Sequence, residues 1–227
     1  MTKESLERLC RSALHTLQQA VASYSAETGE LPYFLVHRVA HELPQALLDT
    51  CVVSASRYQM MQRIGHQGKV IELGTQTGAF AKFLIDTLAP AELHVVDIDY
   101  SLFRHELFTD SDRAILKIHE GSSWDVARSF PPGYFDLAYI DASHAYEHVI
   151  KDLDACVHAV KPAGLIVCND FVSWSPFEAV PYGVPKAVTE LIAQRGYPVK
   201  HLALHPMGYH DIAFQTTPTT TNQSSGL

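Results

Sequence analysis

The stretch Val70-Ile71-Glu72-Leu73-Gly74-Thr75-Gln76-Thr77-Gly78 decides the predicted fold. A short apolar run ends in an acid, a loop with two glycines follows, and an apolar helical pattern runs from Ala79 to Leu88. This order predicts a strand, a tight turn and a helix. Glycines permit positive φ and close approach to a ligand, and a helix start offers free N–H groups. The spacing is not the Gly-x-Gly-x-x-Gly of dinucleotide folds, and no lysine follows Gly78, which argues against a triphosphate loop.

The composition favours one globular α/β domain. The chain has 227 residues, room for a full core, and 47% of them are apolar and 19% charged. The formal net charge of −8 argues against nucleic acid as the main partner, because phosphate binding needs clustered Lys and Arg. No apolar run reaches the roughly 18 residues of a membrane span. We therefore expect no membrane partner. The four cysteines have no metal-ligand spacing, and we expect a cytoplasmic protein.

From residue 69 onward, strand and helix patterns alternate, which predicts a parallel sheet with crossover helices. The expected strands are 69–73, 92–97, 114–119, 135–141 and 163–169. The expected helices are 78–88, 101–107, 122–129, 144–160 and 185–195. Two late strands, 198–205 and 209–215, flank Pro206-Met207-Gly208, which predicts a terminal hairpin.

Helical patterns precede this core at about 3–24, 33–41 and 44–64. We therefore expect an N-terminal helical extension at 1–64, a core at 65–215 and a disordered tail at 216–227. The extension could cover the active site or pair two subunits as a homodimer. It could equally be a scaffold that covers one face of the sheet.

Acids and amides follow the strands of the expected core. Asp97 and Asp99 end the strand at 92–97, Asp141 ends the strand at 135–141, and Asn169 and Asp170 follow the strand at 163–169. Ligands bind beyond the carboxyl ends of parallel strands, which lie roughly 4.8 Å apart. Asp141, Asn169 and Asp170 should therefore converge as a hard oxygen cluster suited to Mg²⁺ or Ca²⁺. Asp99 would also suit a helix cap.

The Glu-x-Gly-x-x-x-Gly pattern resembles the first motif of the class I S-adenosylmethionine (SAM)-dependent methyltransferases. The resemblance covers about 65–215 and implies a Rossmann-like, seven-stranded, mostly parallel sheet with a terminal antiparallel hairpin, preceded by N-terminal helices. It implies SAM as the cofactor, with its ribose on Asp97 and its adenine near residues 121–124. The residues expected to bind SAM are Glu72, Gly74, Thr75, Gln76, Gly78, Phe80, Asp97, Asp99, Gly121, Ser122, Ser123, Trp124 and Asp141.

The strand-end acids are similar to those of metal-dependent O-methyltransferases of the catechol and macrolide-sugar types. Asn169 and Asp170 follow Asp141 by 28 and 29 residues, which matches that spacing, although the catechol type has the pair in the order Asp-Asn. The resemblance implies Mg²⁺ on Asp141, Asn169 and Asp170, with His144 and Asp141 as catalytic residues. A divalent cation stabilises the acceptor oxyanion, and histidine can take the proton near neutral pH.

These patterns predict a SAM-dependent methyltransferase that acts on a hydroxyl of a small-molecule acceptor. The alternatives are a metal-independent N- or O-methyltransferase, a fold-related hydroxylase similar to cephalosporin hydroxylase, and a non-catalytic SAM binder. Structural explanations also stand. Ser122 or Asp141 could cap a helix, His144 could be a surface residue, and the aromatic loop at 171–184 could either wall an acceptor or only pack.

Overall fold

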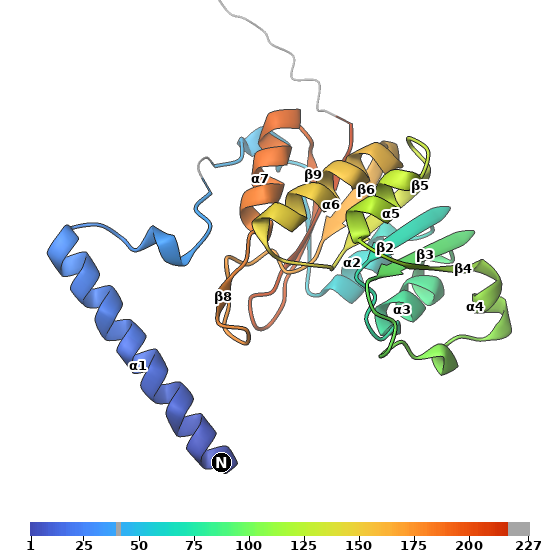
Figure 1. The fold of residues 1–227 in the computed structure, drawn as a ribbon. Helices are drawn as coiled ribbons and strands as arrows, with labels where there is room; N and C mark the ends of the chain where they lie inside the picture. The colour runs from blue at the N-terminus through green and yellow to red at the C-terminus, as the bar shows by residue number, and fades with distance from the viewer. Residues whose placement is uncertain (40–41, 218–227) are drawn as a thin grey trace, which may run out of the picture.

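An eight-stranded sheet forms the centre of the molecule in a computed structural model that describes residues 1–39 and 42–217 (Figure 1). The strand order is β1-β9-β10-β6-β5-β2-β3-β4, and only β10 runs antiparallel to its neighbours. The order reverses at β2, because β3 and β4 lie on one side of it and β5 and β6 on the other. The expected Rossmann-like fold, with a mostly parallel sheet and an antiparallel terminal hairpin, is confirmed.

The elements have the following bounds. The strands of the sheet are β1 Val52–Ser54, β2 Lys69–Leu73, β3 Glu92–Asp97, β4 Leu116–Glu120, β5 Phe135–Ile140, β6 Val160–Cys168, β9 Val199–Ala203 and β10 Asp211–Gln215; β7 Trp174–Ser175 and β8 Val180–Pro181 form a separate ladder. The α-helices are α1 Lys3–Thr28, α2 Arg57–Ile64, α3 Ala79–Leu88, α4 Asp110–Ile115, α5 Ser123–Ser129, α6 Tyr146–Ala159 and α7 Val184–Arg195. Short 3₁₀ helices lie at Tyr33–Leu35, Gln45–Leu47 and His105–Leu107.

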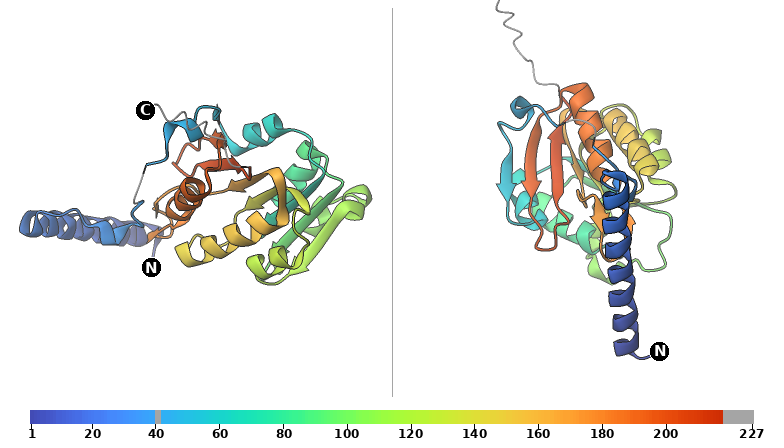
Figure 2. Two further views of the ribbon diagram at one scale, coloured as in Figure 1. Left: turned by 90° about the horizontal axis from the view of Figure 1, so that it is seen from above. Right: turned by 90° about the vertical axis from the view of Figure 1, so that its left-hand side faces the viewer.

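Helices cover both faces of the sheet (Figure 2). Successive side chains of β2 alternate between the faces. Val70 packs with the α2 and α3 side, whereas Ile71 and Leu73 pack with α5, α6 and α7. Burial of β2 on both faces explains why its sequence is almost continuously apolar. This packing fixes the carboxyl end of β2, from which the glycine loop emerges.

The helices expected at 44–64 and 101–107 are largely replaced by other elements. The pattern at 44–64 divides into a 3₁₀ turn, the strand β1 and the helix α2, because Val52 and Val53 pair in parallel with β9 and extend the sheet to an eighth strand. The pattern at 101–107 forms a turn followed by the 3₁₀ helix His105–Leu107. Asp99 starts that turn by accepting hydrogen bonds from the backbone N–H and the hydroxyl of Ser101.

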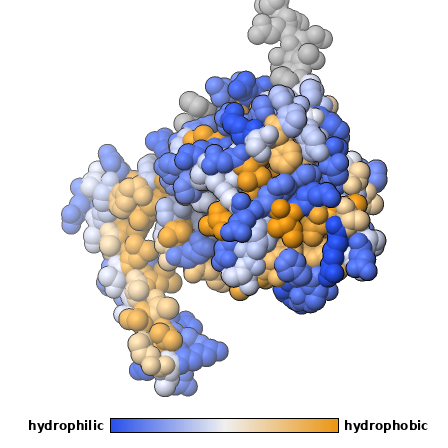
Figure 3. Space-filling model, turned by 45° about the vertical axis from the view of Figure 1, so that its right-hand side comes forward, coloured by the Kyte–Doolittle hydropathy of each residue, from blue (hydrophilic) through white to orange (hydrophobic). Residues whose placement is uncertain are grey.

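The first helix, α1, extends away from the body and buries none of its residues (Figures 1 and 2). Its exposed leucines form an apolar stripe, visible in orange in Figure 3; they are Leu6, Leu9, Leu14 and Leu17. The described residues between α1 and β1 form only 3₁₀ turns, so the helix expected at 33–41 is absent from residues 33–39, and residues 40–41 lie outside the described part. Most of the expected tail, residues 218–227, also lies outside the described part. No helix among the described residues is long and apolar enough to cross a membrane.

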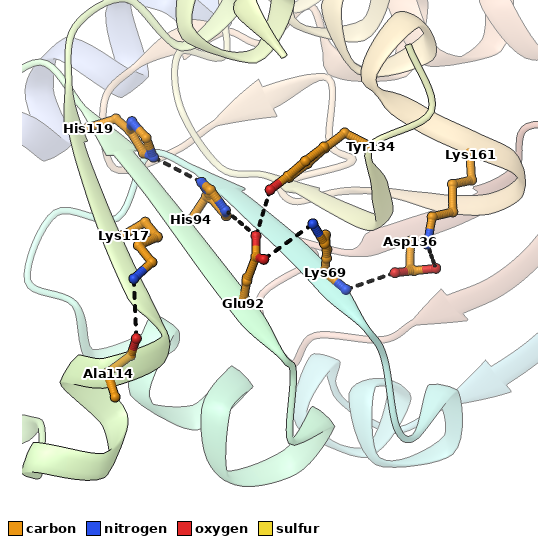
Figure 4. Close-up of polar contacts among 9 residues, drawn as sticks. All are labelled: Lys69, Glu92, His94, Ala114, Lys117, His119, Tyr134, Asp136 and Lys161. Carbon is orange, nitrogen blue, oxygen red and sulfur yellow. Dashed lines mark hydrogen bonds and ion pairs between the residues drawn. The ribbon is translucent and has the colours of Figure 1, made fainter. Parts of the chain in front are cut away.

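Polar contacts tie the strands together away from the strand ends that the site uses (Figure 4). Glu92 accepts a hydrogen bond from the Tyr134 hydroxyl at 2.7 Å and pairs with Lys69 at 3.2 Å. Asp136 pairs with Lys161 at 2.6 Å and accepts a hydrogen bond from the Lys69 backbone N–H at 2.7 Å. A hollow of about 390 Å³ lies beside Asp136 and Lys161, and no expected site residue lines it. We interpret this region as structural.

Candidate active site

The carboxyl ends of five strands meet at one edge of the sheet, as the sequence predicts. Backbone hydrogen bonds of 2.8–2.9 Å join each loop start to the neighbouring strand end: Gly121 N to Asp97 O, Gly74 N to Val96 O, Asp141 N to Leu73 O, and Asn169 N to Ile140 O. The loops after β2, β3, β4, β5 and β6 therefore begin side by side. This alignment brings most of the expected site residues to one edge.

The glycine loop after β2 needs glycine at its first position. Gly74 has φ +85°, and a Cβ placed there would lie 2.1 Å from the backbone oxygen of Asp141. Gly78 has φ +75°, and a Cβ there would lie 2.6 Å from the Phe103 ring. Gln76 takes φ 45°, which is uncommon for a residue with a side chain. The loop is therefore a tightly constrained turn packed against the loop after β5.

Asp97 holds the glycine loop in place. Its Oδ2 accepts hydrogen bonds from the backbone N–H groups of Thr75 at 3.1 Å and Gln76 at 2.7 Å, and its Oδ1 accepts one from the next peptide. If a ribose hydroxyl binds here, it would donate a hydrogen bond to the same carboxylate that accepts those of the loop. Asp99 makes its bonds within the turn to Ser101 and caps no α-helix. Ribose binding by Asp97 stays a prediction.

Buried polar atoms without partners gather among the expected site residues. Seven side-chain nitrogen or oxygen atoms in the described part of the chain are buried with no hydrogen-bond partner. Four of them belong to expected site residues: Glu72 Oε2, Thr75 Oγ1, Ser122 Oγ and His144 Nε2. Buried polar groups in native proteins nearly always have partners, so these atoms fit a site that is completed by a ligand.

The first two of these residues lie in and after β2. Glu72 is 1% exposed, and burial raises the pKa of its carboxyl to about 8, with the charges of Asp141 and Asp97 adding to the effect. Thr75 is 5% exposed. An acid that is mostly protonated at neutral pH next to a constrained glycine loop suits a ligand that carries positive charge, because such a ligand would favour its ionised form. The glycine cradle and these unpartnered atoms therefore fit SAM.

The segment expected to hold adenine has mixed geometry. Ser122 precedes α5 at the N-cap position, but its hydroxyl makes no capping hydrogen bond. Ser123 instead donates its hydroxyl to Asp152 Oδ1 at 2.5 Å, a buried contact with α6. The Trp124 ring lies 5.3 Å from the His148 ring, also on α6. The buried hydroxyl of Ser122 thus has no partner among the described residues, whereas the side chain of Ser123 is already engaged.

His144 lies between the two expected carboxylates. Its Nε2 is 3.8 Å from Asp141 Oδ1 and 3.5 Å from Asp170 Oδ2. Burial lowers the pKa of the imidazole, but the neighbouring Asp141 and Asp170 outweigh it, so the pKa of His144 lies above its usual value. Burial in turn raises the pKa of Asp170. Asp170 has φ 55°, a left-handed conformation that is uncommon for a residue with a side chain.

The aromatic loop fixes the orientation of the imidazole. The Tyr182 ring stacks on the His144 ring with centroids 4.3 Å apart and an angle of 11° between the planes. Gly183 N donates a hydrogen bond to the carbonyl of His144 at 2.7 Å, and a Cβ on Gly183 would lie 2.3 Å from the Cα of Tyr146. Tyr182 belongs to the loop at 171–184 that was expected either to wall an acceptor or only to pack, and no local pattern indicates its contact with His144.

Two charged residues that were not expected from the sequence, Asp211 and Arg57, also lie in the site. Asp211, 2% exposed at the start of β10, accepts hydrogen bonds from the Tyr139 hydroxyl at 2.7 Å and from Asn169 Nδ2 at 3.2 Å. Burial raises the pKa of Asp211 to about 7. Arg57 lies 3.5 Å from Asp141 Oδ2 and donates to the Tyr139 hydroxyl at 3.3 Å. The sequence feature that could have indicated Asp211 is its position directly before the apolar run Ile212–Phe214. No sequence motif indicates that Arg57 lies in the site.

The oxygen cluster expected for Mg²⁺ is not assembled. Mg²⁺ requires oxygen ligands at about 2.0–2.1 Å in near-octahedral geometry. Arg57 pairs with Asp141, and the imidazole of His144 lies between Asp141 and Asp170. Asn169 donates its Nδ2 to Asp211, so only its amide oxygen could bind a cation. The described residues include no group of three or more His, Cys, Asp or Glu side chains arranged to hold a metal ion. These donors therefore do not fit the metal that the resemblance implies.

Comparison with known proteins identifies a domain type within the chain and a shared fold. Residues 71–171, a little under half of the chain, match the family model of a methyltransferase domain. No curated protein sequence matches the chain. The matched segment runs from β2 to the start of the aromatic loop, so it contains the glycine loop, the strand-end acids and His144.

Solved structures show the same fold at low sequence identity. A protein from Klebsiella pneumoniae, provisionally assigned as an O-methyltransferase, is 20% identical with a TM-score of 0.56; the alignment covers 77% of this chain and 86% of that one. The cofactor-bound Rv0187 from MTB is 16% identical with a TM-score of 0.55 and the same coverage of both chains. The domain match at residues 71–171, on a fold of the same kind, supports a methyltransferase enzyme.

Proposed function

We propose that this chain transfers a methyl group from SAM to a hydroxyl of a small molecule, with His144 as the general base. The observation that carries the proposal is the set of buried, unpartnered polar atoms at the carboxyl edge of the sheet, on Glu72, Thr75, Ser122 and His144. Three of these residues, Glu72, Thr75 and Ser122, are among those expected to bind the cofactor. The fourth, His144, places its Nε2 3.8 Å from Asp141 and 3.5 Å from Asp170 without a hydrogen bond to either.

When bound, SAM supplies a methyl group on a sulfonium, whose C–S bond breaks with its electron pair left on sulfur. The chain contributes orientation and removal of the acceptor proton. Glu72, Thr75 and Ser122 would bind the cofactor, and the backbone of the loop from Gly74 to Gly78 would allow its close approach. His144 Nε2 accepts the hydroxyl proton as the acceptor oxygen becomes nucleophilic.

Asp141 and Asp170 assist the base by stabilising its charged form. A proton taken up by His144 creates an imidazolium 3.8 and 3.5 Å from their carboxylate oxygens. Only neutral imidazole can accept the proton, and the neighbouring acids hold the pKa of His144 above its usual value. The rate should therefore rise with pH through that raised pKa and then level off.

A metal has no step in this proposal, because the donors do not fit one. The sequence-based expectation of Mg²⁺ on Asp141, Asn169 and Asp170 and the metal-independent alternative predict different responses to chelators. We favour metal-independent transfer. Treatment with EDTA should leave turnover unchanged, and added Mg²⁺ should not raise it.

Calorimetry and mass spectrometry test the proposal together. Wild-type protein should bind SAM, and with a panel of phenols and other small hydroxylated molecules it should form S-adenosylhomocysteine and a methylated product. His144→Ala should lower turnover by roughly 10²–10⁴-fold while SAM binding persists. The matched control is His66→Ala, an exposed histidine before β2, which should keep wild-type turnover. Asp97→Ala should abolish SAM binding, because the glycine loop loses its acceptor.

Three results would reject the proposal. A wild-type protein that does not bind SAM would remove the cofactor. Unchanged turnover in His144→Ala would remove the base. A product formed only with iron and an oxidant, without S-adenosylhomocysteine, would favour the hydroxylase alternative.

A further inference from the structure

Arg57 places a fixed positive charge inside the site. It is the first residue of α2, which Ser56 caps by accepting a hydrogen bond from Gln59 N at 3.3 Å. Its guanidinium lies 3.5 Å from Asp141 Oδ2, donates to the Tyr139 hydroxyl at 3.3 Å and stands 4.5 Å from the centre of the Phe80 ring. An ion pair, a hydrogen bond and a cation–π contact hold it from three directions, and its side chain is 29% exposed.

Arg57 has no counterpart among the other basic residues. Of the ion pairs in residues 1–39 and 42–217, only that of Arg57 joins a Lys or Arg to an acid expected in the site. Its charge also lowers the pKa values of Glu72, Asp170 and Asp211, against the larger effect of burial. One guanidinium therefore balances several carboxyl groups at this edge of the sheet.

The position of Arg57 competes with a divalent cation. A cation on Asp141 would need direct bonds to the carboxylate oxygens and would lie close to a guanidinium of like charge. The two oxygens of Asp141 have different neighbours: Oδ2 faces Arg57, and Oδ1 faces His144. Asn169 donates its Nδ2 to Asp211 Oδ1 at 3.2 Å, so Asp211 orients the amide but leaves its oxygen unused, and the competition with a cation lies at Asp141.

We propose that Arg57 is a positioning residue that takes the place of a divalent cation beside Asp141, so that this site excludes the metal. Arg57 holds one oxygen of Asp141, and the other oxygen faces the base. This inference rests on the proposed methyl transfer only for its consequence on turnover; the exclusion of metal is a property of the unliganded protein.

Direct metal binding tests the inference without any activity. Mn²⁺ is titrated by calorimetry, and by electron paramagnetic resonance of the free ion, into wild-type protein, Arg57→Met and Arg57→Lys. Methionine keeps the apolar stem and removes the charge, whereas lysine keeps the charge. Wild type and Arg57→Lys should show no binding at this site, and Arg57→Met should gain affinity by at least about tenfold. Adding Asp170→Asn to Arg57→Met should remove the gain.

Controls separate this effect from misfolding. Arg63→Met removes an exposed arginine from the same helix and should bind Mn²⁺ as weakly as wild type. Thermal unfolding and circular dichroism of each variant show whether it is folded. If Arg57→Met does not fold, Arg57→Gln replaces it, because glutamine can still hydrogen-bond Tyr139 without carrying a charge.

Turnover gives a second readout. Chelator-treated wild type should keep its rate; Arg57→Met should lose kcat while its affinity for SAM changes little, and Arg57→Lys should recover part of kcat. Wild-type binding of Mn²⁺ that Asp141→Asn removes would overturn the inference, as would equal Mn²⁺ affinity in Arg57→Met and Arg57→Lys. A protein that binds no SAM would reject the proposed function while leaving the metal-binding result intact.

Discussion

Glu72→Gln should abolish a proton release that accompanies SAM binding to the wild-type protein. The Glu72 carboxyl is 1% exposed, and burial raises its pKa to about 8. SAM carries a sulfonium and an ammonium group, and a positive charge nearby favours the ionised carboxylate. Binding should therefore drive the proton from Glu72 into solvent.

The magnitude follows from the pKa. At pH 7, one unit below a pKa of about 8, roughly 90% of the Glu72 carboxyls carry a proton. A cofactor that lowers this pKa to 6 or below should release about 0.8–0.9 proton per SAM at pH 7 and only about 0.1 at pH 9. By linkage, the affinity for SAM should weaken by up to about tenfold for each pH unit below 8.

Calorimetry in buffers of different ionisation enthalpy measures the proton count directly. The amino group of SAM also titrates near neutral pH, so the quantity of interest is the difference between wild type and Glu72→Gln. Glutamine has nearly the same volume as glutamate and cannot titrate. S-adenosylhomocysteine, which lacks the sulfonium charge, should release fewer protons than SAM from the wild-type protein.

Two outcomes would refute this reasoning. Equal proton release by wild type and Glu72→Gln would show that Glu72 is not the source. Binding of SAM to wild type with no proton release at pH 7 would show either that the carboxyl is already ionised or that the cofactor's charge lies too far from it.

Three further predictions concern the loop, a buried acid and the first helix. Gly74→Ala should destabilise the protein by more than the roughly 1–3 kcal/mol of left-handed backbone strain, because its Cβ would also meet a backbone oxygen at 2.1 Å; Gly208→Ala, with φ +84° and open space, is the matched control in denaturant unfolding. Burial raises the pKa of Asp152 to about 6, so its contribution to stability is present below the unfolded pKa and lost as pH rises through 6. The free energy of unfolding of Asp152→Asn should therefore rise by up to about 3 kcal/mol relative to that of wild type as the pH goes from 4 to 8. A difference between the two proteins that stays constant with pH would contradict the raised pKa. The exposed leucines of α1 predict that the protein is a homodimer. In light scattering, the double variant Leu9→Glu with Leu14→Glu should be a monomer and should keep its methyl transfer. A wild-type protein that is itself a monomer would contradict the prediction.

Local patterns determined the core of the fold and the positions of the site loops. The apolar run Val70–Leu73 followed by Gly74 and Gly78 gives a strand, a turn and a helix, because side-chain periodicity and permitted φ angles act within a few residues. Parallel strands then bring their carboxyl ends to one edge, so the meeting of Asp141 and Asp170 with His144 could be predicted. The helices at 44–64 and 101–107 could not be predicted correctly, because pairing with β9 and a side-chain turn at Asp99 outweighed their helical patterns.

Tertiary structure alone decided how those side chains are used. The hydrogen bond from Arg57 to Tyr139 joins residues 82 positions apart in the sequence, and the hydrogen bond from Tyr139 to Asp211 joins residues 72 positions apart. Neither pair lies within one element or one motif, so no local pattern indicates them. Asp211 also accepts a hydrogen bond from Asn169 Nδ2, and Arg57 places a guanidinium 3.5 Å from Asp141, so an arginine stands beside an acid that was expected to hold a metal. The sequence determined which groups gather at the strand ends, because alternating strand and helix patterns imply parallel strands whose carboxyl ends share one edge. The placement of α2 and β10 beside that edge decided what each group contacts.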